Sequence, residues 1–127
     1  MKARIREERG SNLIEVALLI PLLFSLLIGV VDFGRAYHTY ITMINAAREG
    51  ARYAVDQPDD VSTIANIVRQ EAQSSNVDLS AAVINVDNQG PGNPVTVTVQ
   101  MNFPTILGGI IGFNNIPLQV SATFRVR

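Results

Sequence analysis

The fold is decided by one stretch near the start of the chain, residues 10–31, which reads GSNLIEVALLIPLLFSLLIGVV. From Leu13 to Val31 the only charged residue is Glu15. At about 1.5 Å per residue, a helix of roughly 19 residues spans most of a bilayer hydrocarbon core of about 30 Å. The stretch therefore predicts one helix that crosses a membrane.

Three interpretations of this stretch compete, and its flanks separate them. A cleaved secretory signal has a shorter apolar core and a small-x-small cleavage site, and residues 32–38 offer no convincing one. A buried helix of a soluble protein needs packing partners on all sides, which a chain of 127 residues can hardly supply. We therefore expect a retained membrane helix over residues 11–35, with Asp32 and Arg35 paired at its outer interface.

Charge is unevenly distributed around the apolar stretch, although the net charge of the chain is only −1. Before the stretch, two acidic residues are outnumbered by basic ones, namely Lys2, Arg4, Arg6 and Arg9. By the positive-inside rule, residues 1–10 form a basic cytoplasmic leader and residues 36–127 form an extracytoplasmic head that includes the continuation of the helix. The predicted location is the cytoplasmic (inner) membrane, crossed once.

Two residues inside the apolar stretch are unusual. Pro21 lacks a backbone N–H, so we expect a bend there, which membrane helices tolerate better than soluble ones. Glu15 places a carboxyl group in an apolar segment. Either it lies close enough to the inner boundary to snorkel among lipid headgroups, or it pairs with a positive partner, because an acidic group inside a membrane is costly.

The remainder of the chain predicts a small α+β head. Apolar residues at spacings of three and four predict that the first helix continues to about Val55. Its apolar face is expected to hold Tyr37, Tyr40, Ile41, Ile44, Ala47, Ala51, Ala54 and Val55. The tyrosines on this face either sit at the outer membrane interface or pack under the head. After Pro58, Asp59 or Asp60 is expected to cap a second, shorter helix that ends near residues 74–76.

Three stretches of alternating apolar and polar residues predict strands, at residues 82–87, 95–103 and 116–127. They are expected to form an antiparallel meander with one apolar face, which the two helices cover. Residues 104–115, PTILGGIIGFNN, separate the last two strands. Either this segment is a loop that tucks Ile106, Leu107, Ile110 and Ile111 under the sheet, or it is an exposed apolar tip that contacts another subunit or the membrane surface.

The residues from Gly10 onward resemble the processing site of type IV pilin-like proteins. In those proteins a short basic leader ends in a glycine, and an apolar helix with glutamate at its fifth position follows. The resemblance implies that a prepilin peptidase cuts between Gly10 and Ser11, and that Glu15 neutralises the terminal amine of a neighbouring subunit during assembly. Ser11 stands where major pilins have phenylalanine, and an uncleaved anchor is the alternative.

Three further runs make the resemblance more specific: EVALLIP at 15–21, VVDFGR at 30–35, and AAREGARYA at 46–54. They are similar to the TadE/TadG-like family of the tight-adherence (Tad) pilus system, with Arg48, Gly50 and Arg52 in the last run. The family implies a pilin-like fold and a single-pass minor pilin or pseudopilin. Its implied partners are membrane lipid, other pilin-like subunits, the Tad-type assembly machinery with its secretion ATPase, and a prepilin peptidase.

Residue types that carry chemistry are scarce. Cysteine is absent, His38 is the only histidine, and no glycine-rich phosphate loop with lysine or calcium-loop spacing occurs. The sequence contains no basic patch with interleaved aromatic residues, so nucleic acid is not an expected partner. The sequence predicts a structural, non-catalytic protein without metal or cofactor. The alternative is an uncleaved signal-anchor protein whose extracytoplasmic head is a binding module.

Arg48 and Arg52 either form a solvated helix face or contact the head or a neighbouring subunit.

Overall fold

The computed structural model describes the backbone of residues 2–125 and the side chains of residues 10–125. The side chains of the basic leader up to Arg9 and the last two residues of the predicted third strand lie outside this range. The elements in chain order are α1 (Lys2–Ala54), α2 (Val61–Ser74), β1 (Val83–Asn88), β2 (Pro94–Pro104), α3 (Ile106–Ile111) and β3 (Asn115–Arg125). The strands form one antiparallel sheet in the order β1-β2-β3, which confirms the α+β class.

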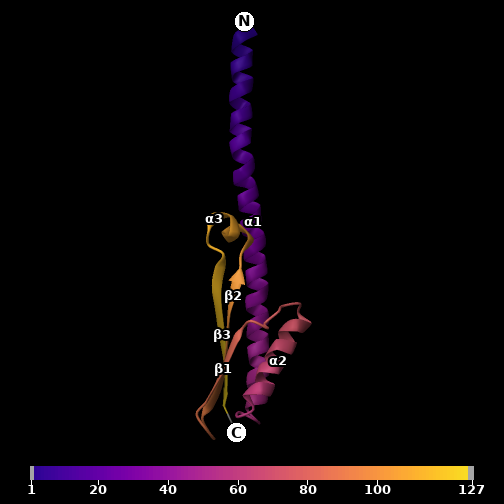
Figure 1. The fold of residues 1–127 in the computed structure, drawn as a ribbon, viewed down its shortest axis with the longest axis vertical. Coiled ribbons are helices and arrows are strands. Elements are labelled where there is room, and N and C mark those ends of the chain that lie inside the picture. Colours follow the sequence, from indigo (N-terminus) through magenta and orange to yellow (C-terminus); the bar gives the residue numbers. More distant parts are fainter. Residues whose placement is uncertain (1, 126–127) are drawn as a thin grey trace.

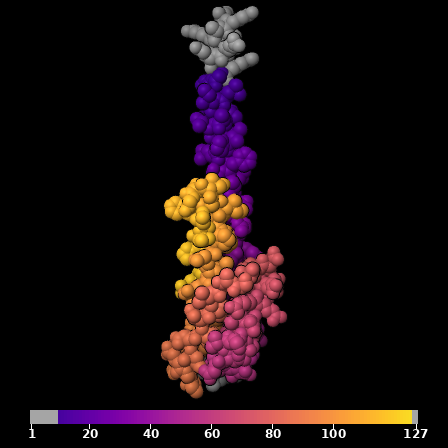
Figure 2. All heavy atoms as spheres, viewed as in Figure 1, coloured from indigo at the N-terminus to yellow at the C-terminus, as the bar shows by residue number. Residues whose placement is uncertain are grey.

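Helix α1 has two parts with different surroundings. Its most apolar window of 18 residues has a mean hydropathy of 2.6, and none of that window is buried. Figures 1 and 2 show this part standing free of the head, whereas the later part of α1 lies against the sheet and α2. The helix is assigned without interruption through Pro21, whose carbonyl oxygen accepts the Ser25 hydroxyl at 2.8 Å. The bend at Pro21 stays a prediction.

Apart from Met43, the face of α1 that packs under the head is made of small residues. Tyr37 and Tyr40 are 60% and 40% exposed, which excludes the alternative in which they pack under the head and leaves the outer-interface alternative. The prediction for this face was wrong at Ile41, which is 39% exposed. The distance between packed elements depends on the side chains at the contact, so close approach selects small residues over the most apolar ones. The buried residues of this part of α1 are Thr39, Thr42, Met43, Ala46, Ala47, Gly50, Ala51 and Ala54.

Helix α2 begins at the predicted cap. The carboxylate of Asp60 accepts the backbone N–H of Thr63 at 3.1 Å and the hydroxyl of Ser62 at 2.9 Å. The Thr63 side chain, the Ser62 hydroxyl and the Thr63 backbone N–H hold the pKa of Asp60 below its ordinary value of 3.8. The ionised cap therefore stabilises the head above the unfolded-state pKa, and this contribution is lost as the pH falls through the lower folded-state pKa.

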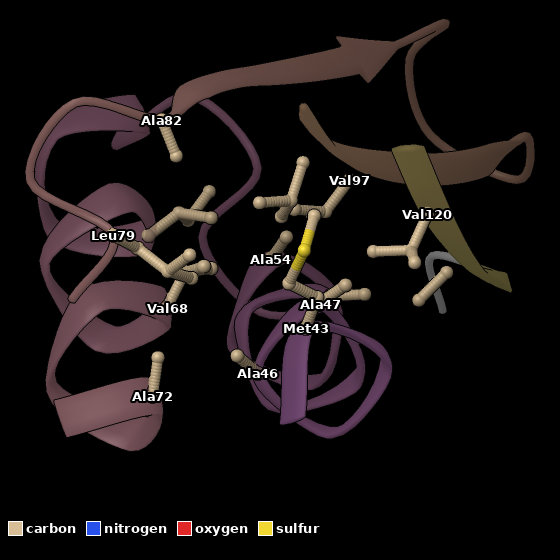
Figure 3. Packing of buried hydrophobic residues seen from close by; sticks show 14 of the residues in the cluster. Met43, Ala46, Ala47, Ala54, Val68, Ala72, Leu79, Ala82, Val97 and Val120 are labelled. Atoms are coloured by element: carbon tan, nitrogen blue, oxygen red, sulfur yellow. The ribbon is translucent and has the colours of Figure 1, made fainter. Parts of the chain in front are cut away.

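The sheet presents one apolar face to both helices. Seen in Figure 3, α1 and α2 lie side by side on the same side of the sheet, with Val97 and Val120 pointing toward Met43 and Ala47. On the opposite face, the hydroxyl pairs Thr96–Thr123 and Thr98–Ser121 lie 2.9 and 3.0 Å apart across β2 and β3. The alternation read from the sequence therefore assigned the two faces of β2 and β3 correctly.

The segment between β2 and β3 is a short helix rather than a loop tucked under the sheet. Ile110 and Ile111 are 69% and 61% exposed, which excludes the tucked interpretation for these two residues. Gly112, at a φ of 95°, ends α3, and its N–H bonds to the Gly108 carbonyl oxygen at 2.8 Å. A Cβ at Gly108 would overlap the Phe113 carbonyl oxygen and the Thr105 hydroxyl, so only glycine closes this turn.

Candidate functional site

The junction between the end of the apolar stretch and the head centres on one carboxylate. Asp32 Oδ1 accepts the backbone N–H of Ile106 at 3.0 Å, and Oδ2 accepts that of Leu107 at 2.7 Å. Arg35 Nη1 donates to Asp32 Oδ1 at 3.1 Å. We call these four residues the Asp32 clamp. Asp32 is only 7% exposed, and its charge is matched by two N–H groups at the start of α3 and by one guanidinium.

Arg35 extends the clamp to the sheet. Its guanidinium carbon lies 5.2 Å from the centre of the Phe103 ring, a distance typical of a cation–π contact. Phe103 is buried near the end of β2. The clamp therefore joins α1 both to the start of α3 and to the end of β2.

Sequence reasoning found half of this site. The pairing of Asp32 with Arg35 follows from their spacing on a helix, and the structure places the two side chains in contact. The bonds from α3 were missed because they join residues 74 and 75 positions apart. In the structure Thr105, at the N-cap of α3, makes no side-chain cap bond of its own, and the cap comes from Asp32.

An apolar groove lies beside the clamp, between α1 and α3. It has a volume of about 330 Å³, and its lining includes Gly29, Phe33, Leu107, Ile111 and Phe113. A Cβ built on Gly29 would lie 3.5 Å from Leu107 Cδ2, so α3 packs closely against α1 at this level.

The residues predicted to act in processing and assembly lie on the free part of α1. Ser11 and Glu15 are exposed, and the helix continues on both sides of Gly10. Among residues 10–125, the ion pairs are Asp32–Arg35 and Glu49–Arg52, and Glu15 belongs to neither. The structure thus leaves Glu15 on the open surface of the helix, away from the head.

In the motif around Gly50, the glycine packs inside the head, whereas Arg48 and Arg52 lie on the surface. Gly50 is buried, and a Cβ there would come within 2.5 Å of Val68 Cγ2 on α2. Arg48 and Arg52 are exposed, and Arg52 Nη1 lies 3.7 Å from Glu49 Oε2. An exposed ion pair of this kind adds little stability, so the glycine is the residue of this motif that shapes the fold.

Other polar side chains are dispersed. His38 Nε2 lies 3.2 Å from the Ser75 carbonyl oxygen, which links α1 to the end of α2. Among the residues that the structure describes, no three His, Cys, Asp or Glu side chains gather into a group that could hold a metal ion. The arrangement supports contacts between elements and between surfaces.

Comparison with known proteins bears on the N-terminal part of the chain. No curated protein and no solved structure matches the chain significantly. The family model described as TadE-like protein matches residues 10–52, as the sequence resemblance predicted. This range includes the apolar stretch, Asp32 and Gly50, whereas their contacts on α2 and α3 lie beyond it. Residues 10–52 therefore match the TadE-like family, and this segment includes the N-terminal apolar helix.

Proposed function

We propose that this chain is a membrane-anchored minor pilin or pseudopilin of a Tad-like pilus assembly or secretion apparatus, with a structural and non-catalytic role. The observation that carries the proposal is the bare apolar half of α1 within the TadE-like match. An apolar helix that no part of the chain covers needs lipid or other helices around it. A pilin-like subunit uses both, lipid before assembly and neighbouring helices afterwards.

The proposed topology has residues 11–35 crossing the inner membrane, with the N-terminus cytoplasmic and residues 36–127 outside. The basic residues before the apolar stretch support this direction. The exposed ring of Tyr37, which stacks on Phe33 with centroids 6.3 Å apart, supports an outer boundary at this level. Amphipathic aromatic rings are favoured at the membrane–water interface.

The proposed assembly step depends on the free amine that processing creates. Removal of residues 1–10 by a prepilin peptidase leaves the amine on Ser11, four residues before Glu15. Glu15 of one subunit then pairs with the amine of its neighbour, and the apolar helices pack laterally. An ion pair of this kind makes a carboxylate tolerable in an apolar environment.

Processing is tested by the mass of the mature chain in cells that contain the prepilin peptidase. We expect the full-length product to begin at Ser11. The Gly10→Leu variant should retain residues 1–10, because the proposed site requires glycine before the cut. Intact-mass spectrometry of the membrane fraction distinguishes the two forms. A wild-type chain that still carries the leader there would refute processing and favour the uncleaved signal-anchor alternative.

A further inference from the structure

The exposed apolar side chains of α3 and the residues around it gather at one end of the head. We call this group the apolar tip: Ile106, Ile110, Ile111 and Phe113. All four are exposed, from 49% at Ile106 to 77% at Phe113. No charged residue occurs anywhere in residues 104–118. A surface this apolar and this free of charge is unusual for a segment that faces only water.

The tip is held at the height where the bare part of α1 ends. Leu107 packs against Gly29, and the Asp32 clamp fixes the first turn of α3 at Asp32. Val31 and Phe33 of α1 are themselves largely exposed at this level. Figure 2 shows the tip, in yellow, as the part of the head beside the free part of α1. The apolar surface of the anchor therefore continues onto the tip.

We propose that the apolar tip inserts into the outer leaflet, as a second contact of the chain with lipid. This inference rests on the proposed anchoring by residues 11–35. Gly29 precedes Asp32 by three residues on α1, which is a rise of about 5 Å toward the membrane centre. Because Leu107 packs against Gly29, it lies about 5 Å deeper than Asp32. That is the depth, about 5–10 Å, at which interfacial helices lie between headgroups and acyl chains.

Several polar groups at the base of the tip are already bonded within the protein, which lowers the cost of insertion. Both oxygens of Asp32 are bonded in the clamp. The Thr105 hydroxyl donates to the Phe113 carbonyl oxygen at 3.0 Å, and the Thr105 N–H donates to that of Asn114 at 3.0 Å. Within the described side chains, no buried nitrogen or oxygen atom lacks a hydrogen-bond partner.

Insertion at two points has a mechanical consequence. A single helix leaves the head free to tilt relative to the membrane surface, whereas a helix and a tip together restrain this tilt. The tip thus sets the tilt at which the head meets neighbouring subunits at the membrane surface.

The test uses tryptophan as a depth probe, because the chain contains none. Three full-length variants each carry one Phe→Trp substitution at an exposed position: F24W in the anchor, F113W in the tip and F124W near the end of β3. Each variant is reconstituted in vesicles of phosphatidylcholine and phosphatidylglycerol, with or without bromine on the acyl chains, which quenches tryptophan in contact with them. Circular dichroism checks that all three variants keep the wild-type helix content.

We expect brominated lipid to quench F24W and F113W strongly and to leave F124W unchanged. If F24W is quenched and F113W is not, the anchor is correct and tip insertion is overturned, including the case in which F113W is shielded by a second copy of the chain. If F24W itself is not quenched, the proposed anchoring fails. The two failures are therefore distinguishable.

Discussion

Replacing Asp32 by alanine is expected to release α3 from α1 while the sheet stays folded. The substitution leaves the backbone N–H groups of Ile106 and Leu107 without their acceptor, and α3 has no other side-chain cap. A helix of six residues does not persist on its own, because nucleation is costly and its bonds are few. Of the variants considered, this one should change the local order of the head most.

Hydrogen exchange followed by mass spectrometry measures this release in the full chain in detergent. Residues 104–115 of Asp32→Ala should exchange as fast as an unstructured segment, whereas protection of β2 at Val97 and Val99 should be retained. Arg35→Ala should have a smaller effect, because it removes only one of the three groups on the carboxylate. Glu49→Ala, which breaks the exposed pair with Arg52, is the matched control and should be silent. Unchanged exchange in residues 104–115 would contradict the clamp.

Replacing Gly50 by alanine is expected to destabilise the contact between α1 and α2. The added Cβ would lie 2.5 Å from Val68 Cγ2, so the helices or the valine must move. Overpacking of a well-packed core costs about 1–3 kcal/mol. Alanine also gains about 0.5–1 kcal/mol over glycine inside a helix. The clash outweighs this gain because Val68 is fully buried and has little room to shift.

Denaturant unfolding of the head, monitored in detergent, measures this loss. Gly34→Ala is the control in the same helix: nothing lies within 4 Å of its Cβ position, so it should be neutral or slightly stabilising. Combining Gly50→Ala with Val68→Ala should cost less than the sum of the two single substitutions, since removing the valine methyl groups relieves the clash. Additive costs, or a Gly50→Ala variant as stable as wild type, would show that the helices do not meet there.

The sequence predicted the elements apart from α3, and it predicted the packing less well. The helical period and the strict alternation depend on each residue and its near neighbours, so the end of α1 and the faces of β2 and β3 were assigned correctly. The predicted apolar face of α1 was wrong at Ile41, and the pattern left the placement of Tyr37 and Tyr40 open, because close packing selects by size. The bonds to Ile106 and Leu107 were not foreseeable, because they depend on how the whole sheet is placed on α1.

The TadE-like range contains the α1 side of two contacts that help to hold the head. Asp32 binds the start of α3, and Gly50 meets Val68 of α2. Both residues lie within residues 10–52, and both partners lie beyond them. The matched segment is therefore an apolar helix followed by a docking surface for the head.

Glu15 provides the most direct test of the proposed function. In cells that assemble a Tad-like pilus and carry the gene only as a variant, Glu15→Gln removes the charge with little change in shape. We predict that the amount of this chain recovered in the assembled apparatus falls by about tenfold or more, since removing one partner of a buried ion pair is strongly unfavourable. Its level in the membrane should match wild type, and Glu49→Gln, an exposed position on the same helix, should assemble normally. Assembly of Glu15→Gln at the wild-type level would contradict the pilin-like role and favour an anchor that does not polymerise.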